Sequence, residues 1–353
     1  MMSGVDEPSA DQPAADLPGT SELSLDGIAA SIGAPPDTDP EPSQRPADRL
    51  AELVQWWAQV APSPGSPPKR VDHLWADSTE WPLGSTASVS ARSFDPPATR
   101  SMDEISAWAV AEADAVIDAG ADLVLLAVPV GAGASAPGVL AASVLALDAV
   151  DAAGWPSATG MSDVSWMVKV TAIRDGLRRL RGPFDDGTSG SGSGQGSGSD
   201  DGSGFGQGGG SGPQPPSADE TLRRLGDRAL TAGCAVLLRC ASRRTPVLLE
   251  GLGAASAALF AQHLNRAARP WWQFADGPIS AGTGTAQPGA GSWQGSAKAG
   301  PGVVPGVRDP LHDRVLAAMD AEPITRLGLS WPDGTAGRIA FSMLETAIYR
   351  ASR

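Results

Sequence analysis

The stretch 121–147, "ADLVLLAVPVGAGASAPGVLAASVLAL", decides the fold of this chain. Residues 123–128 are all apolar, and an unbroken apolar run of this length is typical of a strand that is buried on both faces. Glycines at 131 and 133 interrupt the run, and the small and apolar residues after them predict a helix. A buried strand that leads through a glycine loop into a helix indicates an α/β fold with a parallel sheet.

The remaining ordered segments continue this alternation of helices and strands. Parallel strands need crossover connections, and helices that cross over cover the faces of the sheet. We therefore expect a doubly wound, mostly parallel sheet with helices on both faces, plus a small helical part from the termini. The expected helices cover 45–60, 101–120, 139–154, 162–182, 217–244, 254–267, 309–321 and the C-terminal stretch after 334, and the expected strands cover 121–130, 245–251 and 324–330.

Single residues predict several helix boundaries and one helix face. Ser101 with Glu104, and Ser217 with Glu220, have the spacing of a capping box. Pro310 suits the first turn of its helix. In the helix at 162–182, the residues expected to face the core are Val164, Val168, Ile173, Leu177 and Leu180.

Three stretches of low-complexity composition divide the chain. Residues 1–45 are rich in Pro, Ala, Asp and Ser, residues 185–216 are Gly/Ser-rich, and residues 276–307 are rich in Gly, Pro and Ser. Such compositions bury too little apolar surface to order the backbone. We expect a disordered acidic tail at 1–45, an α/β domain made of 46–184 and 217–353, a linker insertion at 185–216 and a low-complexity loop at 276–307.

Composition excludes several classes of partner. The net charge of −14 argues against nucleic acid, whose phosphates attract basic surfaces. No apolar run approaches the ~20 residues that span a bilayer, and the N-terminus has neither the basic start nor the apolar core of a secretory signal. Cys234 and Cys240 lie six residues apart on an expected helix, a poor geometry for a disulfide, and no metal-ligand spacing is present. We expect a cytoplasmic protein without a cofactor or metal.

Ligands of parallel α/β sheets bind beyond the carboxyl ends of the strands, and three corners of this chain qualify. The first is the loop with Gly131 and Gly133, which either lets a ligand approach the backbone or simply connects a strand to a helix. The second follows Glu250, which either faces a ligand or is a solvated loop carboxylate. The third is "WPDGTAG" at 331–337, a helix entrance that can hold an anion or can be an ordinary turn.

Two further side chains are candidates for a site. Lys169 lies inside the apolar stretch "SWMVKVTA", where a lysine can bind an anion or can extend its head to water along an apolar surface. His312 stands near the start of a helix, a position that suits either a structural or a catalytic histidine. His73 and His263 show no partner pattern.

Several motifs, in order and spacing, resemble the nicotinate-nucleotide–dimethylbenzimidazole phosphoribosyltransferase family. The stretch 118–147 resembles the family's helix end, strand and Gly-Ile-Gly-Asn-Thr loop. Residues 158–177 resemble its next helix, and Lys169 falls on the family's phosphate-contacting lysine. Residues 243–264 are similar to the strand and helix that follow. Asp309, Pro310 and His312 stand in register with Glu-Pro-Gly-His, and Asp333 stands where the family has the glutamate of Gly-Glu-Gly-Thr-Gly.

This resemblance implies an activity and a set of site residues. The family moves the phosphoribosyl group of nicotinate mononucleotide to a benzimidazole-type base and so forms the ribotide of the cobamide lower ligand. Its glutamate is the general base, which implies a catalytic role for Asp333. The partners implied are nicotinate mononucleotide, an aromatic base and a second copy in a homodimer. The implied substrate- and phosphate-binding residues are Gly131, Gly133, Ser135, Lys169, His312, Gly334 and Thr335.

Other positions depart from the family pattern. Asp333 is one methylene shorter than the glutamate, Pro129 replaces an acidic residue, and Ala134 replaces an asparagine. Asp77 is the nearest counterpart we assign to the family's Asp-His-Gly turn, and much of the base-binding region has no counterpart. These departures leave two alternatives open: a degenerate member that binds a nucleotide or regulates a true family enzyme, and a structural partner held by a family-type dimer interface.

Overall fold

The structure is a computed structural model that describes most of the chain outside the low-complexity stretches. Among the predicted site residues, Gly131, Gly133 and Asp333 lie outside the described part, as do Asp77 and most of the linker. The described residues are 24–33, 48–63, 65–74, 87–92, 94–130, 135–156, 161–181, 216–278, 310–329 and 334–353.

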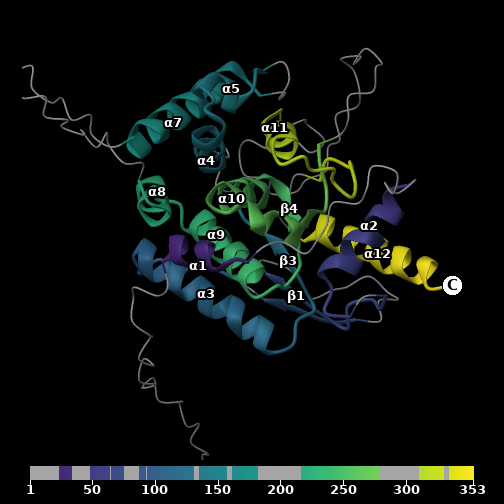
Figure 1. The fold of residues 1–353 in the computed structure, drawn as a ribbon. Coiled ribbons are helices and arrows are strands. Elements are labelled where there is room, and N and C mark those ends of the chain that lie inside the picture. The colour runs from purple at the N-terminus through teal and green to yellow at the C-terminus, as the bar shows by residue number, and fades with distance from the viewer. Residues whose placement is uncertain are drawn as a thin grey trace, which may run out of the picture.

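The centre of the molecule is a five-stranded, fully parallel sheet, which confirms the predicted fold class (Figure 1). The chain runs from β1 outward to β2, crosses back over β1 to β3, and then continues to β4 and β5. The connections therefore change direction between β1 and β3, and ligands of doubly wound sheets bind at such a crevice. In spatial order the strands are β2 (Ser88–Arg92), β1 (Arg70–Leu74), β3 (Leu123–Ala127), β4 (Val247–Glu250) and β5 (Trp272–Phe274).

Helices surround this sheet and account for most of the ordered chain. The predicted capping box of Ser101 and Glu104 is present at the start of α3, and α11 begins at Pro310 as expected. The helices are α1 (Leu25–Ser31), α2 (Arg49–Val60), α3 (Met102–Asp118), α4 (Ser135–Leu145), α5 (Ala149–Ala153), α7 (Asp163–Arg181), α8 (Ala218–Leu225), α9 (Arg228–Ser242), α10 (Gly251–Leu264), the 3-10 helix η2 (Arg266–Trp271), α11 (Pro310–Ala318) and α12 (Thr335–Ala351).

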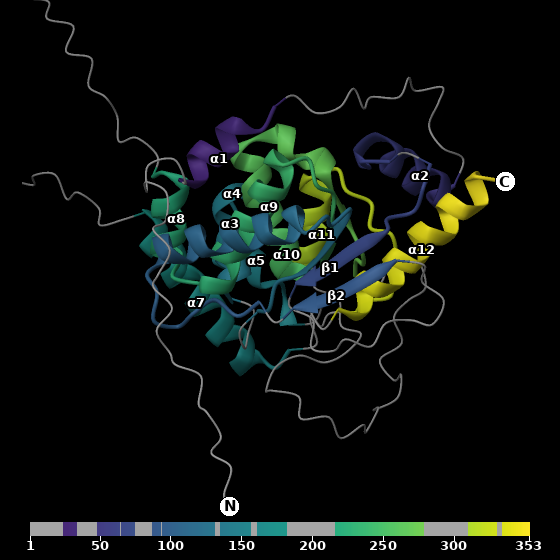
Figure 2. The same cartoon turned by 90° about the horizontal axis from the view of Figure 1, so that it is seen from below.

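Both faces of the sheet are covered. On one face, the side chain of Leu125 lies against α12, where a Cβ on Gly337 would be 3.7 Å from Leu125 Cδ1. Just beyond β3, Val128 lies against α9, since a Cβ on Gly233 would be 2.8 Å from Val128 Cγ2. Figure 2 shows β1 and β2 at the sheet edge, with α2 and α12 to one side and α3 and α9 to the other. The sheet is therefore the middle layer of a three-layer domain.

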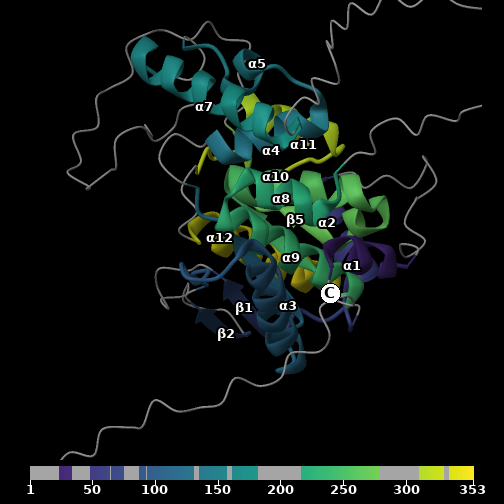
Figure 3. The ribbon, with the colours of Figure 1, turned by 90° about the vertical axis from the view of Figure 1, so that its left-hand side faces the viewer.

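A second group of helices, α4, α5, α7 and α11, stands together beyond α10 at one end of the molecule (Figure 3). Missing side chains let these helices approach closely. A Cβ on Gly176 of α7 would be 2.4 Å from Val139 of α4, and a Cβ on Gly138 would be 2.9 Å from Ile173. Leu311 of α11 also reaches Gly138, at 3.8 Å from the same hypothetical Cβ. The helices that carry Ser135, Lys169 and His312 thus meet at one point.

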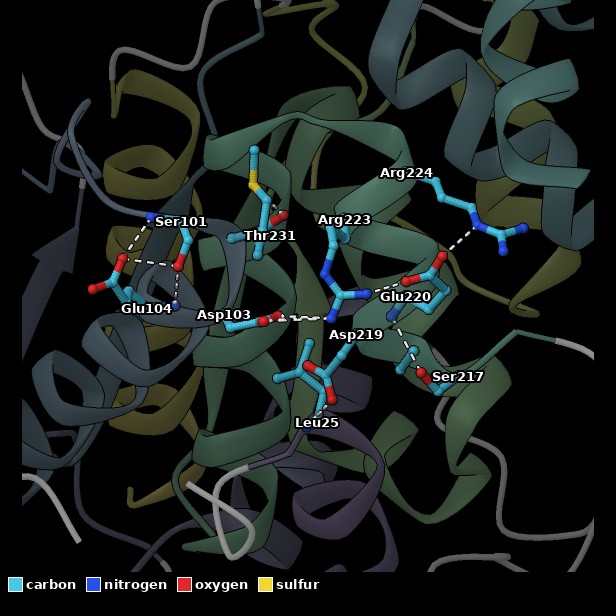
Figure 4. A network of polar contacts seen from close by, with 12 residues as sticks. Leu25, Ser101, Asp103, Glu104, Ser217, Asp219, Glu220, Arg223, Arg224 and Thr231 are labelled. Carbon is cyan, nitrogen blue, oxygen red and sulfur yellow. Dashed lines mark hydrogen bonds and ion pairs between the residues drawn. The ribbon is translucent and has the colours of Figure 1, made fainter. Parts of the chain in front are cut away.

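The N-terminal helix α1 belongs to this domain, which corrects our expectation that residues 1–45 form a disordered tail throughout. Leu25, Ile28, Ala29 and Ile32 are buried. The N–H of Leu25 donates to the Asp219 carboxylate at 3.1 Å, and the N–H of Ala218 donates to the Asp26 carboxylate at 3.0 Å. Figure 4 shows Leu25 and Asp219 next to the ion pairs of Arg223 with Asp103 and Glu220. Helices α1 and α8 therefore cap each other's N-termini.

Some predicted elements differ in detail. The helix expected at 139–154 is two helices, α4 and α5, because Asp148 caps a new start and accepts from Asp151 N–H at 2.7 Å. The helix expected at 217–244 breaks into α8 and α9 at Gly226, whose φ is +73°. The strand expected at 324–330 is wrong: only a bridge between Asp276 and Thr325 forms in its described part. Strands β1, β2 and β5 are not among the strands predicted above.

The predicted face of α7 is half wrong. Ile173, Leu177 and Leu180 are buried as expected, whereas Val164 is 73% exposed and Val168 is 65% exposed. The inward face of the first half of the helix carries Lys169 instead, which is 5% exposed.

The two cysteines are free and buried in α9, in agreement with the prediction that they form no disulfide. Burial raises the pKa of the Cys240 thiol to about 12, and burial also raises the pKa of Cys234. Both thiols therefore stay protonated and unreactive near neutral pH. Among the described helices, none combines the length and the apolar character that crossing a bilayer requires.

Candidate functional site

The carboxyl ends of β1 and β4 meet the N-terminus of α12, at the edge of the sheet where ligands of this architecture bind. His73 comes from β1, Glu250 is the last residue of β4, and Gly334 immediately precedes α12. His73 and Glu250 are each 1% exposed. Polar side chains are seldom buried this deeply. The fold therefore holds both side chains in fixed positions at the strand ends.

The Glu250 carboxylate holds the first turn of α12. Its Oε1 accepts the Gly334 N–H at 2.8 Å, and its Oε2 accepts the Gly337 N–H at 2.7 Å. These amides lack partners inside the helix, and the positive end of the helix dipole further stabilises the carboxylate. Of the two interpretations of Glu250, the solvated loop carboxylate is wrong, because the residue is buried and bonded to backbone.

Gly334 can only be glycine in this arrangement. Its φ of +88° lies in the left-handed region that disfavours a side chain. A Cβ on this residue would also lie 2.2 Å from Cε1 of His73. The ring of His73 therefore packs directly on the backbone of the turn, and β1, β4 and α12 are locked together at this corner.

A second carboxylate holds the chain ahead of the same turn. Asp276, just after β5, is 3% exposed and pairs with Thr325 in an isolated bridge. Its oxygens accept the hydroxyl of Thr325 at 2.6 Å and the N–H groups of Leu327 and Leu329, both at 2.7 Å. The chain up to residue 329 is therefore fixed to the end of β5.

Lys169 is the unusual residue of the helical group. It is 5% exposed, and within the described residues its ammonium makes no hydrogen bond and no ion pair. Lysines at this depth are normally paired, because an isolated charge is costly to bury. Lys169 lies one turn before Ile173, the residue that packs on Gly138 of α4. By helical spacing Lys169 therefore stands on the same face of α7 as Ile173, the face that packs on α4.

The predicted site residues fall into two groups in the structure. Ser135 is the first residue of α4, and His312, 9% exposed, lies in the first turn of α11. The helices that carry these two residues and Lys169, namely α4, α11 and α7, meet at Gly138 through Leu311 and Ile173. Gly334 and Thr335 form the start of α12 against β1 and β4.

Two residues of the sheet edge, His73 and Asp276, were not predicted. The dipeptide Asp72-His73 repeats the first two residues of the family's Asp-His-Gly turn, which we had placed at Asp77. Asp77 lies outside the described residues, whereas His73 stands next to last in β1. The dipeptide at the carboxyl end of a parallel strand was the available signal. Asp276 carried none, because it begins a low-complexity stretch.

The described residues contain no group of three or more His, Cys, Asp or Glu side chains that could hold a metal ion. The carboxylates of Glu250 and Asp276 bind backbone amides instead.

Comparison with known proteins identifies relatives. The family model described as "Phosphoribosyltransferase" matches residues 211–286. A nicotinate-nucleotide--dimethylbenzimidazole phosphoribosyltransferase of Mycobacterium avium (strain 104) is 30% identical over 237 residues, which cover 67% of this chain and 50% of that protein. The protein of the same name from Mycobacterium tuberculosis (strain ATCC 25618 / H37Rv) is 29% identical over 237 residues, with 67% and 48% covered. The chain spans about half the length of the curated relatives it matches.

Solved structures share the fold. CobT from Thermus thermophilus superposes with a TM-score of 0.54 at 15% identity, over 92% of this chain and 95% of that one. At this identity the likeness concerns the fold alone. The relatives, the family model and the shared fold agree with the motifs noted in the sequence, and over its matched residues the chain is similar to the nicotinate-nucleotide–dimethylbenzimidazole phosphoribosyltransferases.

Proposed function

We propose that this protein transfers the 5-phosphoribosyl group of nicotinate mononucleotide to a benzimidazole-type base. The observation that carries the proposal is Lys169, a lysine that is 5% exposed and has no hydrogen bond or ion pair among the described residues. A bound phosphate would supply the missing negative charge. The names of the relatives, nicotinate-nucleotide--dimethylbenzimidazole phosphoribosyltransferase, supply the substrate class.

In this proposal the helical group binds the nucleotide. Lys169 and Ser135 contact the phosphate, together with the backbone N–H groups of Gly131 and Gly133 ahead of α4. His312 borders the same junction, since Leu311 beside it packs on Gly138. The start of α12, with Gly334 and Thr335, faces the reacting end of the nucleotide.

Asp333 is the proposed general base. It directly precedes Gly334, the residue held by Glu250 and packed by His73. As one ring nitrogen of the base attacks the ribose carbon, Asp333 takes the proton from the other ring nitrogen. The bond from ribose to nicotinate breaks, and nicotinate leaves with the electron pair. A positioned base contributes about 10²-fold or more to such a step.

The test measures nicotinate release from nicotinate mononucleotide with 5,6-dimethylbenzimidazole. Asp333→Asn cannot accept the proton, so turnover should fall by about 10²-fold or more. Asp333→Glu, which restores the family's longer side chain, should hold or raise it. Turnover that is indifferent to Asp333→Asn would show that another group is the base. The same resemblance leads us to propose a homodimer, which light scattering of the purified chain measures.

A second candidate is a degenerate member that binds the nucleotide without turning it over. The specific observation in its favour is the glycine loop, where Pro129 and Ala134 replace polar residues of the family. This alternative predicts that nicotinate mononucleotide binds, while no nicotinate is released even from the Asp333→Glu variant.

A further inference from the structure

Two buried carboxylates flank the tetrapeptide at 330–333. Glu250 holds the residue that follows it, Gly334, and Asp276 holds the residue that precedes it, Leu329. The two N–H···O distances are 2.8 Å and 2.7 Å, in the usual range for good hydrogen bonds. Each carboxylate also binds a second amide further from the tetrapeptide, Gly337 on one side and Leu327 on the other.

Both anchors stand on the same rigid support. Glu250 ends β4 and Asp276 follows β5, and these strands pair in parallel with Leu249 opposite Phe274. The anchors are themselves 1% and 3% exposed, so water does not compete for their oxygens. Leu329 and Gly334 are thus fixed to neighbouring strands of the sheet.

The contacts that the anchors make on either side of the tetrapeptide are with backbone amides, and Asp276 also accepts the hydroxyl of Thr325. Each of the four hydrogen bonds is donated by a main-chain N–H. These bonds therefore do not depend on which side chains the tetrapeptide carries. Catalysis by a general base depends on placement within a fraction of an ångström. These bonds fix the two described residues, Leu329 and Gly334, that stand on either side of the tetrapeptide and of the proposed base in the sequence.

We propose that Glu250 and Asp276 are positioning residues for the transferase reaction, acting through the backbone on either side of the tetrapeptide. This inference rests on the proposed function and deepens it. The role assigned to each carboxylate is to hold main-chain amides in place, because its oxygens accept those amides. Their effect is on the rate of the chemical step and not on binding of the nucleotide at the helical group.

Three variants with matched chemistry test the proposal. Glu250→Gln and Asp276→Asn keep the shape of each anchor but turn one acceptor oxygen into an amide group that faces a backbone N–H. Asp122→Asn is the control: its carboxylate also accepts two backbone amides, of Lys69 at 2.8 Å and Arg70 at 3.2 Å, but just before β3, at the opposite edge of the sheet. All three lose the same kind of bond, and only two lose it beside the tetrapeptide.

We expect kcat to fall roughly 10-fold to 100-fold in Glu250→Gln and Asp276→Asn, the scale of a misplacement near 1 Å. KM for nicotinate mononucleotide should stay within about twofold, because the phosphate site is elsewhere. Amide hydrogen exchange should quicken at Gly334 and Gly337 in the first variant and at Leu327 and Leu329 in the second. Asp122→Asn should lose stability with kcat unchanged.

Two results separate the failures. If the wild-type chain turns over and both anchor variants match Asp122→Asn in kcat, or if exchange at the four amides is unaltered, the positioning role is wrong while the proposed function stands. If the wild-type chain releases no nicotinate, the proposed function is wrong. The positioning role for that reaction is then wrong as well. Should Glu250→Gln fail to fold, Asp276→Asn tests the proposal, because it alters the anchor on the other side of the tetrapeptide.

Discussion

Gly334 links the backbone of α12 to the ring of His73. Two separate constraints act on it: the φ of +88° and the 2.2 Å that would separate a Cβ from His73 Cε1. Gly120 offers a matched reference, because its φ is +90° and no described atom lies within 4 Å of a Cβ built there. The difference between the two positions isolates the steric contact from the backbone strain.

Gly334→Ala should therefore destabilise the fold more than Gly120→Ala. Both variants incur the cost of a left-handed alanine, on the order of 1–2 kcal/mol. The clash with His73 should add about 1–3 kcal/mol to Gly334→Ala, the usual cost of overpacking. Denaturant unfolding measures both. Adding His73→Ala should recover part of the loss in Gly334→Ala, and equal losses at the two glycines would show that the ring yields freely.

Lys169 is the other residue whose environment points to a ligand. Lys169→Met keeps the apolar stem and removes the buried charge, so the free protein should gain stability on the order of 1 kcal/mol. Nicotinate mononucleotide at a hundred times its Kd should stabilise the wild type by about 2.7 kcal/mol and the variant by much less. Thermal unfolding with and without the nucleotide measures this. The exposed Lys69 is the control, and Lys69→Met should alter neither value.

At the scale of elements, many of the side-chain hydrogen bonds are made at the N-termini of helices. The pKa of Asp219, which caps α1 from α8, is raised because the carboxyl is partly buried, an effect that the Leu25 N–H opposes. The pKa of Glu104 in the capping box of α3 is lowered, first because it accepts the N–H of Ser101. Two helix caps therefore shift in opposite directions, each for a stated physical cause.

The pH dependence of stability should differ in sign between the two caps. The folded state binds the Asp219 proton more tightly than the unfolded chain, so this contribution is present below pH 3.8 and is lost as pH rises through the raised pKa. For Glu104 the contribution is present above pH 4.5 and is lost as pH falls through the lowered pKa.

Relative to the wild type, Asp219→Asn should thus become more stable as the pH rises from acid to neutral, whereas Glu104→Gln should become less stable. Urea unfolding of the three proteins across this range measures the differences. Parallel curves for the two variants would contradict the assigned causes.

The α7 helix shows where residue patterns misled. Val164 and Val168 match a helical apolar face, yet they are exposed, while Lys169 of the same turn is buried. Periodicity identifies an apolar stripe but not the element that covers it. The breaks between α4 and α5 and between α8 and α9 had local signals, Asp148 and Gly226, that the long apolar runs obscured.

At the scale of the whole molecule, the parallel sheet and its layers followed from the sequence, because buried strands such as 123–128 are continuous apolar runs. β1, β2 and β5 escaped prediction because each is short and mixed in character, and pairing with a neighbour defines them. In the site, Gly334, Lys169 and His312 were visible through motif spacing. The sequence indicated Glu250 as a candidate but not its contacts with backbone amides, and it did not indicate His73. Both residues contact positions far away in the chain, which the local sequence does not reveal.

The division of the chain at the Gly/Ser linker remains a prediction, and the described flanks support it. Arg224 of α8 donates to the carbonyl of Leu180 in α7 at 3.0 Å, so the linker joins two points that are already adjacent. Replacing 187–212 by a few residues should leave the thermal stability nearly unchanged, since loop closure costs only about 0.6 kcal/mol per doubling of length. Differential scanning calorimetry measures it, and a large drop would mean that the segment packs.

The exchange of caps between α1 and α8 also bears on how the protein is made. Leu25 and Asp219 are 194 positions apart, so α1 leaves the ribosome long before the surface that receives it exists. The contacts of α1 with α8, α9 and α10 can form only after most of the chain has been synthesised. Docking of α1 is therefore a late event in vectorial folding. This early segment of the polypeptide packs onto the domain only after the helices that receive it have folded.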